Sequence, residues 1–223
     1  MHRFETVPLG SHETAVTVPS PVKLAIFASG AGSNAEAIIH YSYRIDAAFR
    51  VELVVSNNSR CGAVERACMF DISTAHISSY THPDPEAYTR ALLDVLREHQ
   101  IDMVALAGFM KKIPAAVIDA FSPRGRSRIF NIHPSLLPKF GGQGMYGMAV
   151  HRAVLAASEK ETGCTVHEVD SEYDTGTVIA QRRIPVHPHD TPEQLAQRVV
   201  EHEHELYPHV LQQQARAIQH GLL

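Results

Sequence analysis

Short apolar runs alternate with amphipathic stretches along the first half of the chain. Runs with the length and aliphatic content of buried strands lie at residues 22–28, 51–56, 73–77 and 102–106. Stretches with helical spacing of apolar residues lie between them, at 35–39, 62–69 and 84–98. Because strand and helix alternate, these patterns predict a parallel sheet that is covered by helices on both faces.

The second half of the chain changes this pattern. An apolar strand ends at residues 129–133, a glycine-rich stretch follows it, and a helix is expected at about 149–158. Residues 165–169 and 178–184 predict a strand pair around a loop, which adds an antiparallel edge to the sheet.

The last predicted element is a helix that begins after Thr191. Thr191 is a favourable N-cap, Pro192 suits the first helical position, and Gln194 completes a capping box. The whole pattern predicts an α/β fold. Its centre is a Rossmann-like, mostly parallel twisted sheet with helices on both faces and an antiparallel C-terminal strand pair.

Length and composition add the expected domain organisation. The chain has 223 residues, of which 44% are hydrophobic and 20% charged, and these values allow one large domain. We expect residues 1–21 to be a loose N-terminal extension and residues 22–223 to form a single domain. No run approaches the roughly 18 apolar residues of a membrane span, and the first residues lack a signal pattern. The sequence therefore predicts a cytoplasmic protein with no membrane partner.

Charge and cysteine content exclude other classes. The formal net charge is −4 and no basic block occurs, which argues against a nucleic-acid surface. The three cysteines form no C-x-x-C pair, so they suggest no disulfide framework and fit a reducing compartment. The fifteen histidines invite a metal hypothesis, but pairs such as His187 and His189 lack the spacing of a zinc site. We therefore expect no metal.

Asn131 and His133 form the strongest candidate site. They end an apolar strand, and because side chains alternate along a strand, both project to the same side. Pro134 and Pro138 then interrupt the ladder, so we expect both polar groups at an exposed strand end. An amide beside an imidazole can stabilise an oxyanion and move a proton, which suits acyl-type transfer. A histidine at a strand end is, however, more often structural.

A glycine-containing loop follows the first predicted strand. Gly30 and Gly32 let the backbone approach an anion, and Ser33 and Asn34 add side-chain donors at the start of a helix. The spacing also matches part of a dinucleotide fingerprint, but the second strand does not end in the acidic residue that this fingerprint requires. The loop therefore predicts a site for a phosphate monoester, and a plain tight turn remains the alternative.

Glu203 lies where the last predicted helix should be apolar. It shares a helix face with Leu195, Val199 and Leu206. Its carboxylate either points into a cleft or is solvated at the rim. The position of Glu203 in the sequence alone favours a solvated carboxylate at the rim of the cleft, because charged residues are rarely buried without a partner. Asp174, in an Asp-Thr-Gly string, is by itself typical of a turn.

Four segments carry these features together with their neighbours: GAGSN at 30–34, LAGFM at 106–110, NIHPSLLP at 131–138 and YDTG at 173–176. Together they resemble the phosphoribosylglycinamide formyltransferase family, the folate-dependent enzymes of purine synthesis. The NIHPSLLP segment is shared by a wider group of formyltransferases. Within that group, the resemblance of the glycine loop indicates that the molecule which accepts the formyl group is a phosphorylated glycinamide.

The resemblance implies transfer of a formyl group from 10-formyltetrahydrofolate to the amine of 5-phosphoribosylglycinamide, without a covalent enzyme intermediate. Asn131 would donate to the tetrahedral oxyanion. Protonated His133 would stabilise this oxyanion and serve as general acid, and Asp174 would pair with His133 and favour its charged form. A homodimer is compatible with the resemblance.

The resemblance also assigns the two substrates to different halves of the domain. The phosphate-binding half, residues 22–107, would hold the ribose phosphate at Gly30, Gly32, Ser33 and Asn34. The folate and catalytic half, residues 108–223, would line the pterin pocket at Met110, Lys111, Lys112, Ile113 and Val169 and in the loop before Asp174. Glu203, from this second half, would reach the sugar of the ribonucleotide, which explains a carboxylate on an apolar helix face.

The chain departs from the family pattern in three places. Pro85 stands ahead of the Glu-Ala-Tyr string at 86–88, where the family usually has a folate-side arginine. Lys111 and Lys112 stand where an arginine is expected after Phe-Met. The glycine-rich residues 141–148 are longer than the shortest family form.

Three other hypotheses remain open on the sequence. Methionyl-tRNA formyltransferase would share Asn131, His133 and Asp174, but it needs a further nucleic-acid-binding domain. Formyltetrahydrofolate deformylase has the same core and normally carries an N-terminal regulatory domain, for which residues 1–21 are too short. A nucleotide-binding module without catalysis would not need the three polar residues together.

The glycines at 141–148 predict a mobile flap beside the site. We expect limited proteolysis of the protein without substrates to cut the chain within the flap. Complete resistance of this segment to protease would contradict the hypothesis.

Overall fold

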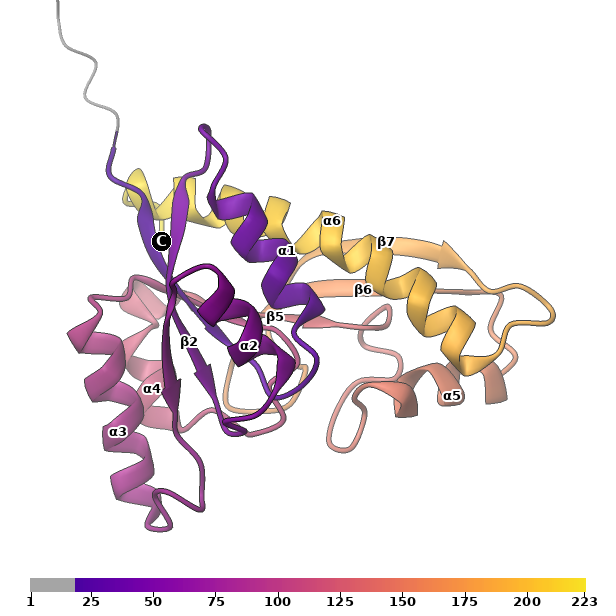
Figure 1. The fold of residues 1–223 in the computed structure, drawn as a ribbon. Coiled ribbons are helices and arrows are strands. Elements are labelled where there is room, and N and C mark those ends of the chain that lie inside the picture. The colour runs from indigo at the N-terminus through magenta and orange to yellow at the C-terminus, as the bar shows by residue number, and fades with distance from the viewer. Residues whose placement is uncertain (1–18) are drawn as a thin grey trace, which may run out of the picture.

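The chain forms one seven-stranded sheet within residues 19–223, which are the residues that the computed structural model describes (Figure 1). The strand order is β3-β2-β1-β4-β5-β6-β7. The strands are β1 (Val22–Phe27), β2 (Phe49–Ser56), β3 (Ser73–His76), β4 (Met103–Leu106), β5 (Ile129–His133), β6 (Glu161–Glu168) and β7 (Val178–Pro185). The expected extension at residues 1–21 lies mostly outside the described residues.

The direction of the strands agrees with the prediction. β1 to β5 pair in parallel, whereas β6 joins β5 and β7 joins β6 in antiparallel pairs. The predicted mostly parallel sheet with an antiparallel pair near the C-terminus is therefore confirmed.

Helices cover both faces of the sheet (Figure 1). They are α1 (Ser33–Ser42), α2 (Gly62–Met69), α3 (Pro85–Glu98), α4 (Ala115–Ala120), α5 (Met148–Ala156) and α6 (Pro192–Gln219). Buried side chains of α1, α2 and α6 pack on one face, and those of α3 and α4 pack on the other. The predicted capping box at the start of α6 is present, because the Thr191 side chain accepts from the Gln194 N–H and the Gln194 side chain accepts from the Thr191 N–H.

Two elements differ from the sequence prediction. The pattern does not predict α4, because its six residues are too few to show a helical period and no side chain caps it. β6 begins at Glu161 instead of residue 165. Its first residues, Glu161 to Gly163, lack an apolar alternation, and they are strand because they pair with β7 up to Pro185.

β1 shows why the central strands read as continuous apolar runs. Leu24 and Ile26 pack with the layer that contains α1, α2 and α6. Ala25 and Phe27 pack with the layer that contains α3 and α4. All four side chains are fully buried. A strand that is covered on both faces has no polar side to reveal its period.

The strand order places a crevice at the carboxyl end of β1. β1 pairs with β2 on one side and with β4 on the other. The order in which strands are added to the sheet therefore reverses between β1 and β4. The Ser29 N–H donates to the Gly108 carbonyl at 3.1 Å, which joins the loops that follow β1 and β4. Ligands of open α/β sheets bind outside the carboxyl ends of strands at such a switch point.

Tyr207 fixes α6 on the two strands next to this crevice. Its side chain is fully buried. Its hydroxyl donates to the carbonyl oxygens of Phe130, at 2.8 Å, and Leu106, at 3.1 Å. Because Glu203 lies about one helical turn earlier, the same contact sets the position of its carboxylate.

The variant Tyr207→Phe tests this contact. We expect it to lower the free energy of unfolding by about 1–3 kcal/mol, because a buried hydrogen bond is lost and buried carbonyls lose a donor. Urea denaturation measures the change. The matched control is Tyr43→Phe, which removes an exposed hydroxyl that donates to the Phe70 carbonyl at 3.2 Å. The control should change stability by less than about 0.5 kcal/mol, and equal effects of the two variants would contradict the assigned role.

Candidate active site

The predicted site residues come together around one cavity of about 510 Å³ at the carboxyl ends of β4 and β5. The expected folate residues all line it: Met110, Lys111, Lys112, Ile113 and Val169. The expected catalytic residues Asn131, His133 and Asp174 line it as well, and so do Asn34 and Glu203. Gly30 and Gly32, in the loop before α1, and Ser33, the first residue of α1, are not part of the wall.

Asn131 and His133 reach the cavity from the same face of β5, as their alternation predicts. The expectation of an exposed strand end is wrong for His133, of which only 3% is exposed. The chain after β5 folds back over the imidazole, and the His133 Nε2 lies 2.8 Å from the Phe140 carbonyl oxygen. Nε2 therefore donates to this carbonyl, and Nδ1 is the nitrogen that faces Asp174.

Asp174 lies between two histidines. Its Oδ2 is 3.5 Å from the His133 Nδ1, and its Oδ1 is 3.5 Å from the His167 Nε2. The Gly142 N–H also donates to Oδ2, at 2.9 Å, so the flap is attached to the same carboxylate. One side chain thus connects β5, β6 and the flap.

His167 is a site residue that the sequence patterns do not single out. The β6 register places it opposite Asn131, and the Asn131 Nδ2 lies 3.0 Å from its Nε2. The His167 Nδ1 lies 2.8 Å from the Glu168 carbonyl oxygen, so Nδ1 carries the proton and Nε2 accepts from the amide. This bond orients Asn131. The only signal in the sequence was a histidine within a predicted strand, and its partner depends on strand register.

His151 on α5 is a second histidine that the patterns do not single out. It lines the cavity, and 3% of it is exposed. Its Nδ1 is buried and has no hydrogen-bond partner within residues 19–223. Burial, with a smaller contribution from His133, lowers the pKa of His151 to about 4. At neutral pH it is therefore an uncharged imidazole.

Burial controls the charge of His133. It lowers the pKa of His133 below the ordinary value, while Asp174 and the Phe140 carbonyl act in the opposite direction without cancelling it. Asp174 thus favours the charged form of His133, whereas burial has the larger effect and favours the neutral imidazole. For Asp174, burial alone would raise the pKa, but the neighbouring imidazoles of His167 and His133 and the Gly142 N–H together lower it. Asp174 is thus a carboxylate at neutral pH.

Glu203 points into the cavity and not to the solvated rim. Only 4% of it is exposed, and the Asn34 Nδ2 donates to its Oε2 at 2.7 Å. Burial raises the pKa of Glu203 to about 7, and the Asn34 hydrogen bond acts against this shift. The Asn34 Oδ1 is itself buried without a partner among the described residues. The pair therefore offers unused hydrogen-bonding groups to a polar ligand.

The glycine loop before α1 has the geometry of an anion site. Gly32 has φ of +82°, and a Cβ there would lie 2.5 Å from the Ala63 Cα, so only glycine fits. A Cβ at Gly30 would meet no atom within 4 Å, so the space beside its backbone is open. No side chain caps the first turn of α1, and its N–H groups remain available.

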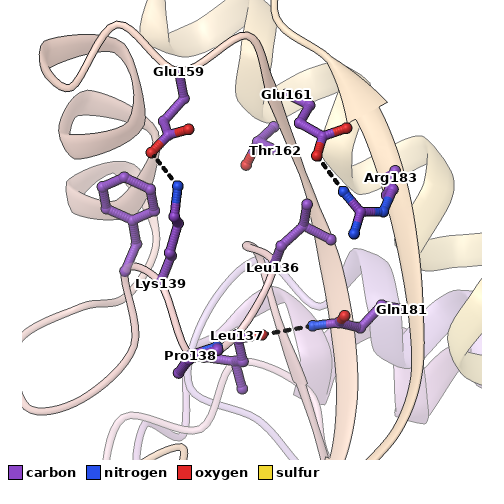
Figure 2. A pocket seen from close by; sticks show the side chains of 10 residues that line it. Leu136, Leu137, Pro138, Lys139, Glu159, Glu161, Thr162, Gln181 and Arg183 are labelled. Carbon is purple, nitrogen blue, oxygen red and sulfur yellow. Dashed lines mark hydrogen bonds and ion pairs between the residues drawn. The ribbon is translucent and has the colours of Figure 1, made fainter.

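A second cavity, of about 230 Å³, lies at the segment 136–140 (Figure 2). Lys139 pairs with Glu159 at 2.8 Å, and Arg183 pairs with Glu161. Gln181 donates to the Leu137 carbonyl at 2.9 Å. The polar groups of this cavity are largely engaged with one another. It lies away from the switch point, so the larger cavity is the better candidate for chemistry.

Between residues 19 and 223, no three His, Cys, Asp or Glu side chains gather in a way that could hold a metal ion. Over the same residues, every helix is too short or too polar to cross a membrane.

This fold and this cavity are those of a formyltransferase: residues 22–211 match the family described as Formyl transferase, and the chain belongs to that family. Within it, the chain is similar to phosphoribosylglycinamide formyltransferases. It is 37% identical to the one from Bacillus subtilis (strain 168), over 86% of this chain and 93% of the relative. The solved glycinamide ribonucleotide transformylase 1 from Geobacillus kaustophilus superposes with a TM-score of 0.80 at 38% identity, covering 88% of this chain and 100% of that one.

A plant relative is longer. The chain is 44% identical to the chloroplastic phosphoribosylglycinamide formyltransferase from Vigna unguiculata over 85% of its own length, but it spans only 60% of that relative.

The raised pKa of Glu203 predicts a pH-dependent effect of Glu203→Gln. The folded-state pKa of about 7 exceeds the ordinary value of 4.5, so the wild type loses stability as pH rises from 4.5 through 7. The amide that replaces the carboxyl in the variant stays uncharged at every pH. Near pH 4.5 the variant and the wild type should have the same free energy of unfolding. At pH 8 the free energy of unfolding of the variant should be higher than that of the wild type by roughly 1–3 kcal/mol.

Urea denaturation at several pH values measures this difference. The matched control is Glu205→Gln, because Glu205 lies on the same helix with 66% of its side chain exposed. Its effect should stay small at every pH. An advantage of Glu203→Gln that is the same at pH 5 and pH 8 would refute the buried, neutral carboxyl.

Proposed function

We propose that the protein transfers the formyl group of 10-formyltetrahydrofolate to the amine of 5-phosphoribosylglycinamide, a step of de novo purine biosynthesis. The observation that carries the proposal is that Asn131, His167, Asp174 and His133 lie side by side in one cavity: Asn131 is hydrogen-bonded to His167, and both histidines lie 3.5 Å from the Asp174 carboxylate. It combines an oriented amide donor, a neutral imidazole and a fixed carboxylate. These are the groups that direct formyl transfer to an amine requires.

The acceptor would bind at the loop after β1 and at α6. Its phosphate would take the free N–H groups of the loop with Gly30, Gly32 and Ser33. Asn34 and Glu203 would take the ribose hydroxyls, because both side chains still have unused polar atoms. A neutral carboxyl can donate as well as accept, which suits a sugar.

The formyl donor would bind between the loop after β4 and the loop between β6 and β7. Met110, Lys111, Lys112, Ile113 and Val169 form this part of the wall. The Met110 N–H is itself engaged by the Ser29 hydroxyl at 2.9 Å, which holds the loop in place. The domain would thus divide into the phosphate-binding half at 22–107 and the folate half at 108–223, with Glu203 crossing over from the second half.

The charges of the cavity favour a particular order of proton transfers. Neutral His133 has a free lone pair on Nδ1 and takes the proton that the attacking amine releases. Asp174 then stabilises the imidazolium, and the imidazolium and Asn131 stabilise the oxyanion. His133 finally returns the proton to the folate nitrogen that leaves. The enzyme forms no covalent bond.

Formyl transfer can be tested with the two substrates. The protein is incubated with 10-formyltetrahydrofolate, with and without 5-phosphoribosylglycinamide, and release of tetrahydrofolate is followed. We expect turnover only when the acceptor is present. Turnover without the acceptor would instead indicate a deformylase, and no turnover in either case would favour a binding module.

Variants of the central set test the roles of its members. His133→Ala and Asp174→Asn should each lower kcat by at least about 10²-fold, because each removes a proton-transfer or charge-stabilising group. Binding of the ribonucleotide should change little. Glu203→Gln should instead raise KM for the ribonucleotide and change kcat little. Near-normal turnover of either catalytic variant would overturn the assignment.

The compartment and the assembly are also part of the proposal. We retain a cytoplasmic location and a homodimer as predictions. Fractionation of cells and light scattering of the purified protein would test them.

A further inference from the structure

The cavity has few positive charges for an anionic substrate. Among the described residues that line it, the acidic side chains are Asp170, Glu172, Asp174 and the buried Glu203, whose pKa is raised to about 7. Within residues 19–223, the lysine or arginine side chains of this wall are Lys111 and Lys112. A folate ends in a glutamate with two carboxylates, at the far end from its pterin. Such a tail is repelled by most of this wall and is attracted only beside the lysines.

Lys112 holds its ammonium group between the two loops that would enclose the folate. It lies in the loop after β4, and its Nζ is 5.8 Å from the centre of the Tyr173 ring. The same Nζ is 3.8 Å from the Glu172 Oε1. Tyr173 and Glu172 belong to the loop between β6 and β7, which also carries Asp174. Lys111 has no such ion pair or ring contact among the described residues.

The ion pair between Lys112 and Glu172 is easily exchanged. The two side chains are 52% and 71% exposed, so water and salt screen their attraction. A carboxylate of a bound ligand can take the place of Glu172 at little cost. Tyr173 remains beside the ammonium group and keeps it near the mouth of the cavity.

We propose that Lys112 binds the carboxylates of the folate glutamate tail by exchanging Glu172 for them, and so raises the affinity for folates with more glutamates. This inference rests on the proposed formyl transfer and names the group that holds one of its substrates. Lys112 is a specificity-determining residue in this role, because it touches the tail and not the reacting atoms.

The experiment measures KM for 10-formyltetrahydrofolate as the monoglutamate and as the triglutamate. Lys112→Met should raise KM for the monoglutamate about 3- to 5-fold, the range of one exposed charge pair, and should raise KM for the triglutamate more. The KM for the ribonucleotide should not change. Added salt should reduce the difference between variant and wild type, because it screens the charges.

Two further variants check the charge itself. Lys112→Arg keeps the cation and should preserve the low KM. Glu172→Gln removes the competing carboxylate and should lower KM below the wild-type value. Lys139→Met is the matched control, since Lys139 is also an exposed lysine in an ion pair, 66% exposed and 2.8 Å from Glu159, but it lies at the smaller cavity (Figure 2). Its folate KM should equal that of the wild type.

The outcomes separate this inference from the proposed function. A wild type that transfers no formyl group would refute the function, and the tail site with it. A wild type that transfers the group, with equal folate KM in Lys112→Met and Lys139→Met for both substrates, would refute the tail site alone. A charge-dependent rise in KM for Lys111→Met but not for Lys112→Met would also overturn it.

Discussion

The Asp174 carboxylate is the point on which the rest of the site depends. It lies between His133 and His167 and accepts the N–H of Gly142 from the flap. Through His167 it is connected to Asn131, the amide donor. One carboxylate therefore sets the relation between two strands and the segment that covers them. Its loss would disturb His133, Asn131 and the flap together, so these groups are best regarded as one unit.

Burial and hydrogen bonding act against each other at His133, Asp174 and Glu203. At His133 and Glu203 burial dominates, and both groups are held in or near their uncharged forms. At Asp174 the Gly142 N–H and the two imidazoles dominate, and the charge is kept. The cavity thus holds a buried negative charge next to groups whose pKa values burial has shifted. This contrast between neighbours is what acid and base catalysis requires.

The two substrates place different demands on the wall. On the side proposed for the acceptor, the wall offers backbone N–H groups and the hydrogen-bonded pair of Asn34 and Glu203. On the side proposed for the formyl donor, it offers long, exposed side chains such as Lys112 and Glu172. Pro85, where the family pattern has an arginine, is not part of the cavity wall, and Lys111 and Lys112 are lysines of the described wall.

Local patterns in the sequence were enough to determine the sheet, most helix limits, the capping box at Thr191 and the shared face of Asn131 and His133. These features depend on neighbours along the chain, through side-chain alternation and turn chemistry. The sequence did not reveal His167, whose role follows from the register of β6 against β5. It also did not reveal that Phe140 covers His133 or that burial outweighs Asp174. Only the tertiary structure decided these points, because register and burial arise from residues that are distant in sequence.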